Sequence, residues 1–99
     1  MYGLQGKMVA KPGQRDTLLG LLLEASRGVP LPGCRLYVVS EVAAEPDAIA
    51  ITEVWDDRDA HLASLQLERV RGLITQARPL IASMEAPVEL RTLGGVGLD

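Results

Sequence analysis

Apolar and polar residues alternate with a period of two at the start of the chain. Over Tyr2–Ala10, one parity carries Leu4, Met8 and Ala10, and the other parity is more polar. This alternation predicts a β-strand with one face toward a core. The sequence Lys-Pro-Gly at positions 11–13 predicts the end of that strand, because proline and glycine favour turns.

A helical period follows over Gln14–Arg27. Leucines recur at the spacing of one helix face, with Leu18 and Leu22 at its centre. Gly28 lies where a C-terminal cap is expected, and Pro30 prevents the helix from continuing.

Two β-rich stretches come next, Cys34–Val42 and Ala48–Trp55, joined by Ala-Glu-Pro-Asp at positions 44–47. Because these four residues favour turns, the two stretches are predicted to form an antiparallel hairpin.

Helical spacing returns after the hairpin. Asp56 and Asp57 offer N-cap carboxylates for a helix expected to reach about Leu67. A second helical pattern covers Val70–Ile81, and Pro79 marks its end or a kink.

A last strand is predicted at Pro87–Thr92, followed by a glycine-rich tail. The element order β-α-β-β-α-α-β is that of an α+β, ferredoxin-like split βαβ fold. We therefore expect one domain over residues 1–99, with a flexible tail at 94–99. Its four-stranded antiparallel sheet should carry the helices on one face, because βαβ crossovers are right-handed. Strands one and three are expected to form a parallel central pair.

Both parities of the middle strands are apolar, which is unusual for a sheet with one face in water. In the second strand, Leu36 and Val38 lie on one parity, and Tyr37 and Val39 on the other. The helices suffice to cover one face. We therefore expect the second face to be covered by another copy of the chain, which predicts a homodimer.

Composition narrows the class of protein. A net charge of −3 with 47% hydrophobic residues fits a globular domain and gives no basic surface for nucleic acid. No apolar stretch is long enough to cross a membrane, and no signal peptide is recognisable, so we expect a cytoplasmic protein. Cys34 is the single cysteine, which excludes an internal disulfide and favours a small core residue.

The stretch Thr52–Leu65, TEVWDDRDAHLASL, holds the only tryptophan, Trp55, and the only histidine, His61. Three interpretations are open. Asp57 and His61 could converge as metal ligands, since they are four residues apart on one helix. The aspartates could cap the helix while Trp55 and His61 only pack. Alternatively, Trp55 could form the wall of a pocket in which His61 acts as a base on a substrate hydroxyl.

The chain resembles the antibiotic biosynthesis monooxygenase (ABM) family over roughly Gly3–Leu93. The most specific feature is Glu-x-Trp at the end of a strand, followed by a histidine and Ser-Leu on the next helix. The resemblance is carried by the segments GKMVAKPGQRD, TEVWDDRDAHLASL and VRGLITQARPLI together with the hairpin.

The resemblance implies a dimeric α/β barrel with a pocket near the end of the third strand. It implies a monooxygenase that oxidises a phenolic, quinol-type or polycyclic aromatic molecule with O₂ and needs no metal, flavin or haem. His61 and Trp55 are then the catalytic candidates. The alternative is a non-catalytic dimeric module of the same fold that binds a small hydrophobic molecule.

Four further residues are expected at the substrate, namely Tyr37, Gly6, Ile51 and Ser64. Gly6 could leave room for a flat ligand. It also replaces an asparagine of haem-degrading members, and Ile51 replaces an asparagine of some members that oxidise aromatics. Haem oxygenation is therefore disfavoured, and the pocket is expected to be largely aliphatic.

Glu53 shares the parity of Trp55 and would be costly to bury without a partner. We expect an arginine, Arg91 or Arg69, to pair with it.

Overall fold

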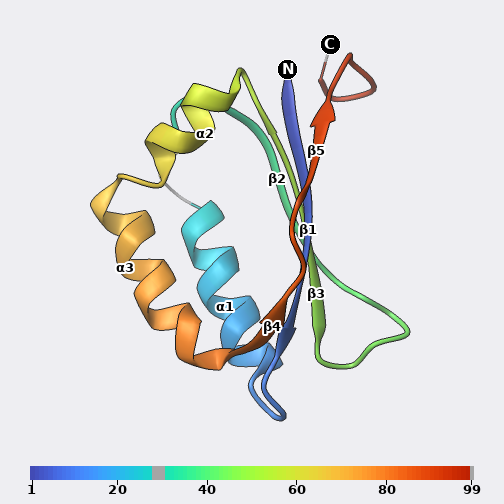
Figure 1. Ribbon diagram of the computed structural model, residues 1–99, viewed down its shortest axis with the longest axis vertical. Coiled ribbons are helices and arrows are strands. Elements are labelled where there is room, and N and C mark those ends of the chain that lie inside the picture. The colour runs from blue at the N-terminus through green and yellow to red at the C-terminus, as the bar shows by residue number, and fades with distance from the viewer. Residues whose placement is uncertain (28–30, 99) are drawn as a thin grey trace.

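The computed structural model describes residues 1–27 and 31–98. In this part of the chain, three α-helices cover one face of a twisted antiparallel sheet (Figure 1). The elements are β1 (Tyr2–Ala10), α1 (Arg15–Ser26), β2 (Cys34–Glu41), β3 (Ala48–Trp55), α2 (Arg58–Ser64), α3 (Glu68–Ala77), the 3₁₀ turn η1 (Arg78–Leu80), β4 (Ile81–Met84) and β5 (Val88–Arg91). The predicted ferredoxin-like arrangement is confirmed.

The predicted bounds hold closely for the first elements. Strands β1 and β3 begin and end at the predicted residues. Helix α1 is one residue shorter at each end, with Gln14 and Arg27 as its caps. The expected roles of Gly28 and Pro30 in ending this helix fall on residues outside the described ranges.

The edge of the sheet beside β1 is divided between two short strands. β5 pairs with Tyr2–Gln5, and β4 pairs with Met8–Ala10. The last strand was predicted, but Ile81 was wrongly assigned to a helix. The helix ends at Ala77, and Pro79 lies in η1, after which the β-branched Ile81 pairs with Ala10.

The expectation of a parallel central pair is wrong. β1 and β3 are adjacent and antiparallel, with Tyr2 opposite Trp55 and Met8 opposite Ile49. The right-handed crossover through α1 makes β1 parallel to β2, but it leaves a gap of one strand between them. β3 fills that gap as the hairpin partner of β2, so it must run against both neighbours.

The apolar core lies between the sheet and helices α1 and α3. Leu18 and Ile49 are fully buried at its centre. The whole buried cluster is Met8, Ala10, Leu18, Leu22, Ile49, Ile51 and Ala77. This cluster lies away from Trp55, where β3 ends. The side chains around Trp55 are therefore not part of it.

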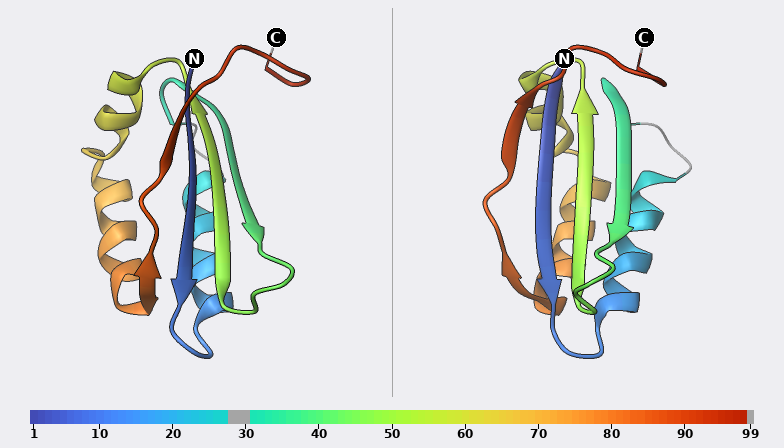
Figure 2. Two further views of the ribbon diagram at one scale, coloured as in Figure 1. Left: turned by 45° about the vertical axis from the view of Figure 1, so that its right-hand side comes forward. Right: turned by 90° about the vertical axis from the view of Figure 1, so that its right-hand side faces the viewer.

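The second face of the sheet, here called the open face, carries the other parity of each strand. No helix in the described part of the chain covers it (Figure 2, right). Val38 is 41% exposed on this face, Val88 56% and Leu90 39%. The apolar character predicted for both faces is therefore present, and these side chains stand in solvent in the isolated chain.

Helix α2 is held in place by two contacts at its start. The Asp57 carboxylate accepts a hydrogen bond from the Ala60 amide at 2.7 Å, as its predicted N-cap role requires. Gly33, whose φ is +78°, accepts a hydrogen bond from the Asp56 amide at 2.8 Å. A Cβ at Gly33 would lie 2.7 Å from the Cβ of Ala60, so the loop before β2 packs directly on α2.

Replacing Asp57 tests the cap. Asp57→Ala should lower the free energy of unfolding by about 0.5–2 kcal/mol, because an amide of the first turn loses its acceptor. Asp59→Ala, which removes an exposed carboxylate from the same first turn, should cost only about 0.3–1 kcal/mol through the helix dipole. Urea denaturation measures both. Equal losses of unfolding free energy in the two variants would contradict a specific capping role for Asp57.

Candidate functional site

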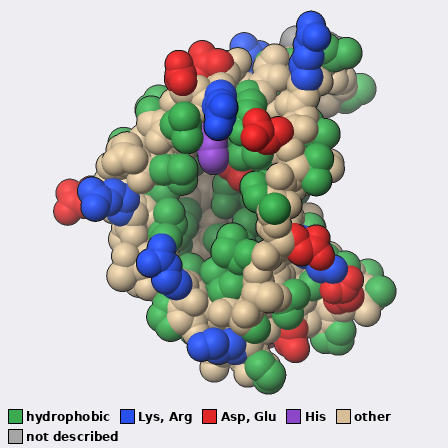
Figure 3. Space-filling view, viewed as in Figure 1, with side chains coloured by type: hydrophobic (Ala, Val, Ile, Leu, Met, Phe, Trp, Pro, Cys, Tyr) green, Lys and Arg blue, Asp and Glu red, His purple; other side chains and the backbone are tan. Residues whose placement is uncertain are grey.

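A pocket of about 190 Å³ lies between the Trp55 end of the sheet and the helices. Figure 3 shows a hollow between the two layers, with the histidine at one end of it. The side chains around the pocket are mostly apolar. They are Met8, Leu22, Ala25, Ser26, Leu31, Tyr37, Ile51, Glu53, Trp55, His61, Ser64, Leu65, Val70, Leu73 and Ile74.

Trp55 and His61 meet at one end of this pocket. Trp55 is the last residue of β3 and is 1% exposed, while His61 lies one turn into α2. Their ring centroids are 5.4 Å apart in an edge-on arrangement. Tyr2 of β1, which is opposite Trp55 in the sheet, lies 6.0 Å from His61, so the imidazole packs against two aromatic rings. This packing orients His61 toward the sheet.

Glu53 is the acidic group of the pocket. Its Oε1 accepts a hydrogen bond from the Trp55 indole at 3.1 Å and lies 3.9 Å from His61 Nε2. Both Glu53 and His61 have side chains only 18% exposed. The expected pairing of Glu53 with Arg91 or Arg69 is wrong, because the polar partners of Glu53 among the described residues are Trp55 and His61.

Burial raises the pKa of Glu53, since an ionised carboxylate is poorly solvated among apolar side chains. The indole hydrogen bond and the positive charge available to His61 act in the opposite direction and lower this pKa. The net shift of the Glu53 pKa is upward, and the carboxyl group lies close enough to His61 to respond to the charge of the imidazole.

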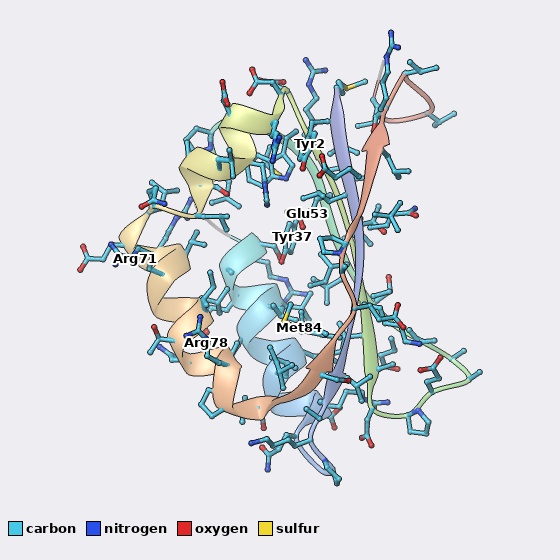
Figure 4. The ribbon with its side chains drawn as sticks, viewed as in Figure 1. Tyr2, Tyr37, Glu53, Arg71, Arg78 and Met84 are labelled. Atoms are coloured by element: carbon cyan, nitrogen blue, oxygen red, sulfur yellow. The ribbon has the colours of Figure 1, made fainter. Side chains whose placement is uncertain are left out.

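Two neighbours of Glu53 hold their protons more tightly than usual. Tyr37 lies directly opposite Glu53 in the sheet and, like it, faces the helices (Figure 4). Burial, reinforced by the negative charge of Glu53, raises the pKa of the Tyr37 hydroxyl. Burial likewise raises the pKa of the Cys34 thiol. Tyr37 is thus a neutral hydrogen-bond donor at the pocket, and Cys34 is disfavoured as a nucleophile.

Ile51 and Gly6 are opposite each other in the β1–β3 ladder, on the helix side of the sheet. Ile51 lines the pocket, but Gly6 is not among the lining residues. A Cβ at Gly6 would have Pro87 as its nearest neighbour, at 4.0 Å. A side chain at position 6 would therefore meet little on the helix side of the sheet, although Gly6 itself does not line the pocket.

Ser64 is 4% exposed and lines the pocket. Its hydroxyl donates a hydrogen bond to the backbone carbonyl of His61 at 2.6 Å. The hydroxyl proton of Ser64 is therefore used in a hydrogen bond within α2. Ser64 thereby ties the last turn of the helix to the residue that carries the imidazole.

The structure places the two possible metal ligands in different surroundings. The exposed carboxylate of Asp57 caps α2, whereas His61 faces Glu53. Within residues 1–27 and 31–98, no three His, Cys, Asp or Glu side chains are grouped so that they could hold a metal ion.

The rest of the pocket wall comes from the helices and was recognised in the sequence only as a helical stripe. Val70, Leu73 and Ile74 of α3 face Leu22 of α1 across the pocket. Their spacing indicated an apolar helix face, which is equally typical of a closed core. The role of Glu53 was missed for a related reason, because an acid on a buried strand suggested an ion pair with arginine.

Comparison with known proteins agrees with this geometry. The model of the antibiotic biosynthesis monooxygenase family matches residues 1–76, so the chain belongs to that family. No curated protein matches the chain significantly. No helix among the described residues has the length and apolar character needed to cross a membrane.

Solved structures show the same fold over nearly the whole chain. A candidate antibiotic biosynthesis monooxygenase from Chloroflexus aurantiacus is 48% identical, with a TM-score of 0.91, and the match covers 99% of this chain and 98% of the other. A second candidate of this name, from Deinococcus radiodurans, is 27% identical, with a TM-score of 0.79 and coverage of 96% and 95%.

Replacing Glu53 by glutamine tests the raised pKa. A folded-state pKa above the unfolded value means that the native state binds this proton more tightly, so ionisation costs stability as the pH rises. Glutamine keeps an oxygen for the Trp55 indole and has no charge to bury. The melting temperature of Glu53→Gln relative to wild type should therefore rise between about pH 4, near the pKa of an ordinary glutamate, and pH 7.

Glu24→Gln, which changes an exposed carboxyl on α1, is the matched control. Its melting temperature relative to wild type should vary less with pH. A Glu53→Gln curve parallel to wild type from pH 4 to 7 would contradict the raised pKa.

Proposed function

We propose that this protein is a cofactor-independent monooxygenase that oxidises a phenolic, quinol-type or polycyclic aromatic molecule with O₂. The observation that carries the proposal is the convergence of Trp55, His61 and Glu53 at one end of a mostly apolar pocket. Family membership supports it further.

The chemistry requires little of the protein, because the substrate supplies the electrons. For an anthrone-like substrate, a base removes a proton from the ring CH₂, and the resulting carbanion reduces O₂ to form a C–O bond. Loss of water from the hydroperoxide breaks the O–O bond and leaves a ketone. One O₂ then yields one ketone oxygen and one water. The protein must bind the ring, accept the proton and exclude bulk water.

In this proposal His61 accepts the proton, and Trp55 and Ile51 bind the flat ring. The Glu53 carboxylate, 3.9 Å from His61 Nε2, stabilises the imidazolium that forms. Tyr37, as a neutral donor, binds the substrate oxygen on which negative charge develops. Ser64 supports this arrangement by fixing the backbone of His61.

Replacing His61 tests the base. His61→Ala should lower the rate of O₂ consumption with anthrones and hydroquinones by about 10²–10⁴-fold, the usual contribution of a positioned acid–base group. An oxygen electrode gives the rate, and thermal melting verifies that the variant is folded.

The matched control is Leu62→Ala, because the Leu62 side chain is 45% exposed on the same helix. It should leave the rate unchanged. If wild-type protein bound these aromatics without consuming O₂, the protein would instead be a non-catalytic module that sequesters its ligand.

A homodimer formed through the open face is the second part of the proposal. Val38 of β2 and Val88 and Leu90 of β5 stand exposed on that face, on its two outer strands. Strands that are apolar on both faces favour a cover on both faces. A second copy packed on the open face by a two-fold axis would cover these apolar side chains in both copies at once.

Sedimentation tests the dimer. Wild-type protein at micromolar concentration should have about twice the chain mass of 10.6 kDa. Val38→Glu should shift it toward the monomer, because it would place two like charges in an apolar contact. Leu62→Glu, on an exposed helix position, should remain dimeric. A monomeric wild type would contradict the proposed assembly.

A further inference from the structure

The pocket described above, here called the inner compartment, continues into a second cavity. This mouth compartment has a volume of about 490 Å³ and lies between α3 and the β4 edge of the sheet. The two compartments share four apolar lining residues, Met8, Leu22, Leu73 and Ile74. A ligand longer than the inner compartment can therefore extend toward η1 without leaving apolar surroundings.

The two ends of this cleft differ in charge. The inner compartment is lined by Glu53 and His61 and, among the described residues, by no lysine or arginine. The mouth compartment has one ionisable side chain among its described lining residues, Arg78. The cleft thus has Glu53 and His61 at one end and Arg78 at the other, separated by apolar side chains.

Arg78 is available for a ligand. It begins η1, directly after α3, and none of the other described residues forms an ion pair or side-chain hydrogen bond with it. In Figure 4, Arg78 lies on the helix side and Met84 on the β4 side of the space between the two layers, whereas Arg71 projects outward from α3. A guanidinium is the preferred partner of carboxylate, sulfonate and phosphate groups.

We propose that the cleft binds an amphipathic aromatic anion in one orientation. The ring lies in the inner compartment, with its hydroxyl or carbonyl toward Tyr37 and His61, and the anionic group lies at Arg78. The reverse orientation would place the anion beside Glu53 in a site of low polarity, which is unfavourable. The inference rests on the proposed function and adds the charge and direction of the substrate.

The test compares two flat three-ring molecules, anthraquinone-2-carboxylate and the neutral 2-methylanthraquinone. Trp55, the only tryptophan, lines the inner compartment, so quenching of its fluorescence reports binding of either quinone. Arg78→Ala should weaken binding of the carboxylate about twofold to fivefold, the range expected for an exposed ion pair. Binding of the neutral quinone should not change.

Arg71→Ala is the matched control, because it removes the same charge from α3 outside both compartments. It should leave both affinities unchanged, and Arg78→Lys should retain part of the preference for the carboxylate. Added salt should reduce that preference in wild type and have less effect in Arg78→Ala.

If Arg78→Ala binds both quinones as wild type does, or if Arg71→Ala weakens the carboxylate equally, the assignment of Arg78 is overturned while the aromatic pocket stands. If neither quinone quenches Trp55, the pocket of the proposed function fails, and this inference fails with it.

Discussion

A buried indole N–H needs an acceptor, and much of this molecule depends on how that need is met. Trp55 is almost fully enclosed, and its acceptor is Glu53, two residues earlier on the same face of β3. A carboxylate is thereby fixed among apolar side chains, where burial raises its pKa and a cationic neighbour is favoured. His61 occupies that neighbouring position, 3.9 Å away. The hydrogen bond between Trp55 and Glu53 thus determines which end of the pocket carries its acidic group.

The same two layers perform two tasks along their length. Around Leu18 and Ile49, which are fully buried, the sheet and the helices are closed against each other. Toward the end of β3, the layers enclose a pocket instead. The closed part keeps the scaffold rigid, while the two compartments leave space for the ligand of the proposed function, as expected when a site is built on regular elements of a stable scaffold.

Local patterns in the sequence predicted most of the fold. Alternation defined β1, β-rich composition around a turn defined the β2–β3 hairpin, the leucine stripe defined α1, and Asp57 was identified as a cap. Long-range consequences were harder to predict. The antiparallel β1–β3 pair follows from which strand fills a gap, and Ile81 pairs with Ala10 from a distant strand although its spacing is helical. The site was predicted by residue type, but the link between Glu53 and His61 depends on where α2 packs.

Gly33 illustrates how tightly α2 is placed. Its positive φ and its contact with Ala60 leave no room for a side chain, so two separate costs oppose any replacement. A residue other than glycine would be tolerated at position 33 only if α2 could move away from it. Because Ala60 immediately precedes His61, such a shift would carry the imidazole with it. In the proposed function, a replacement of Gly33 would therefore act on the position of His61 as well as on stability.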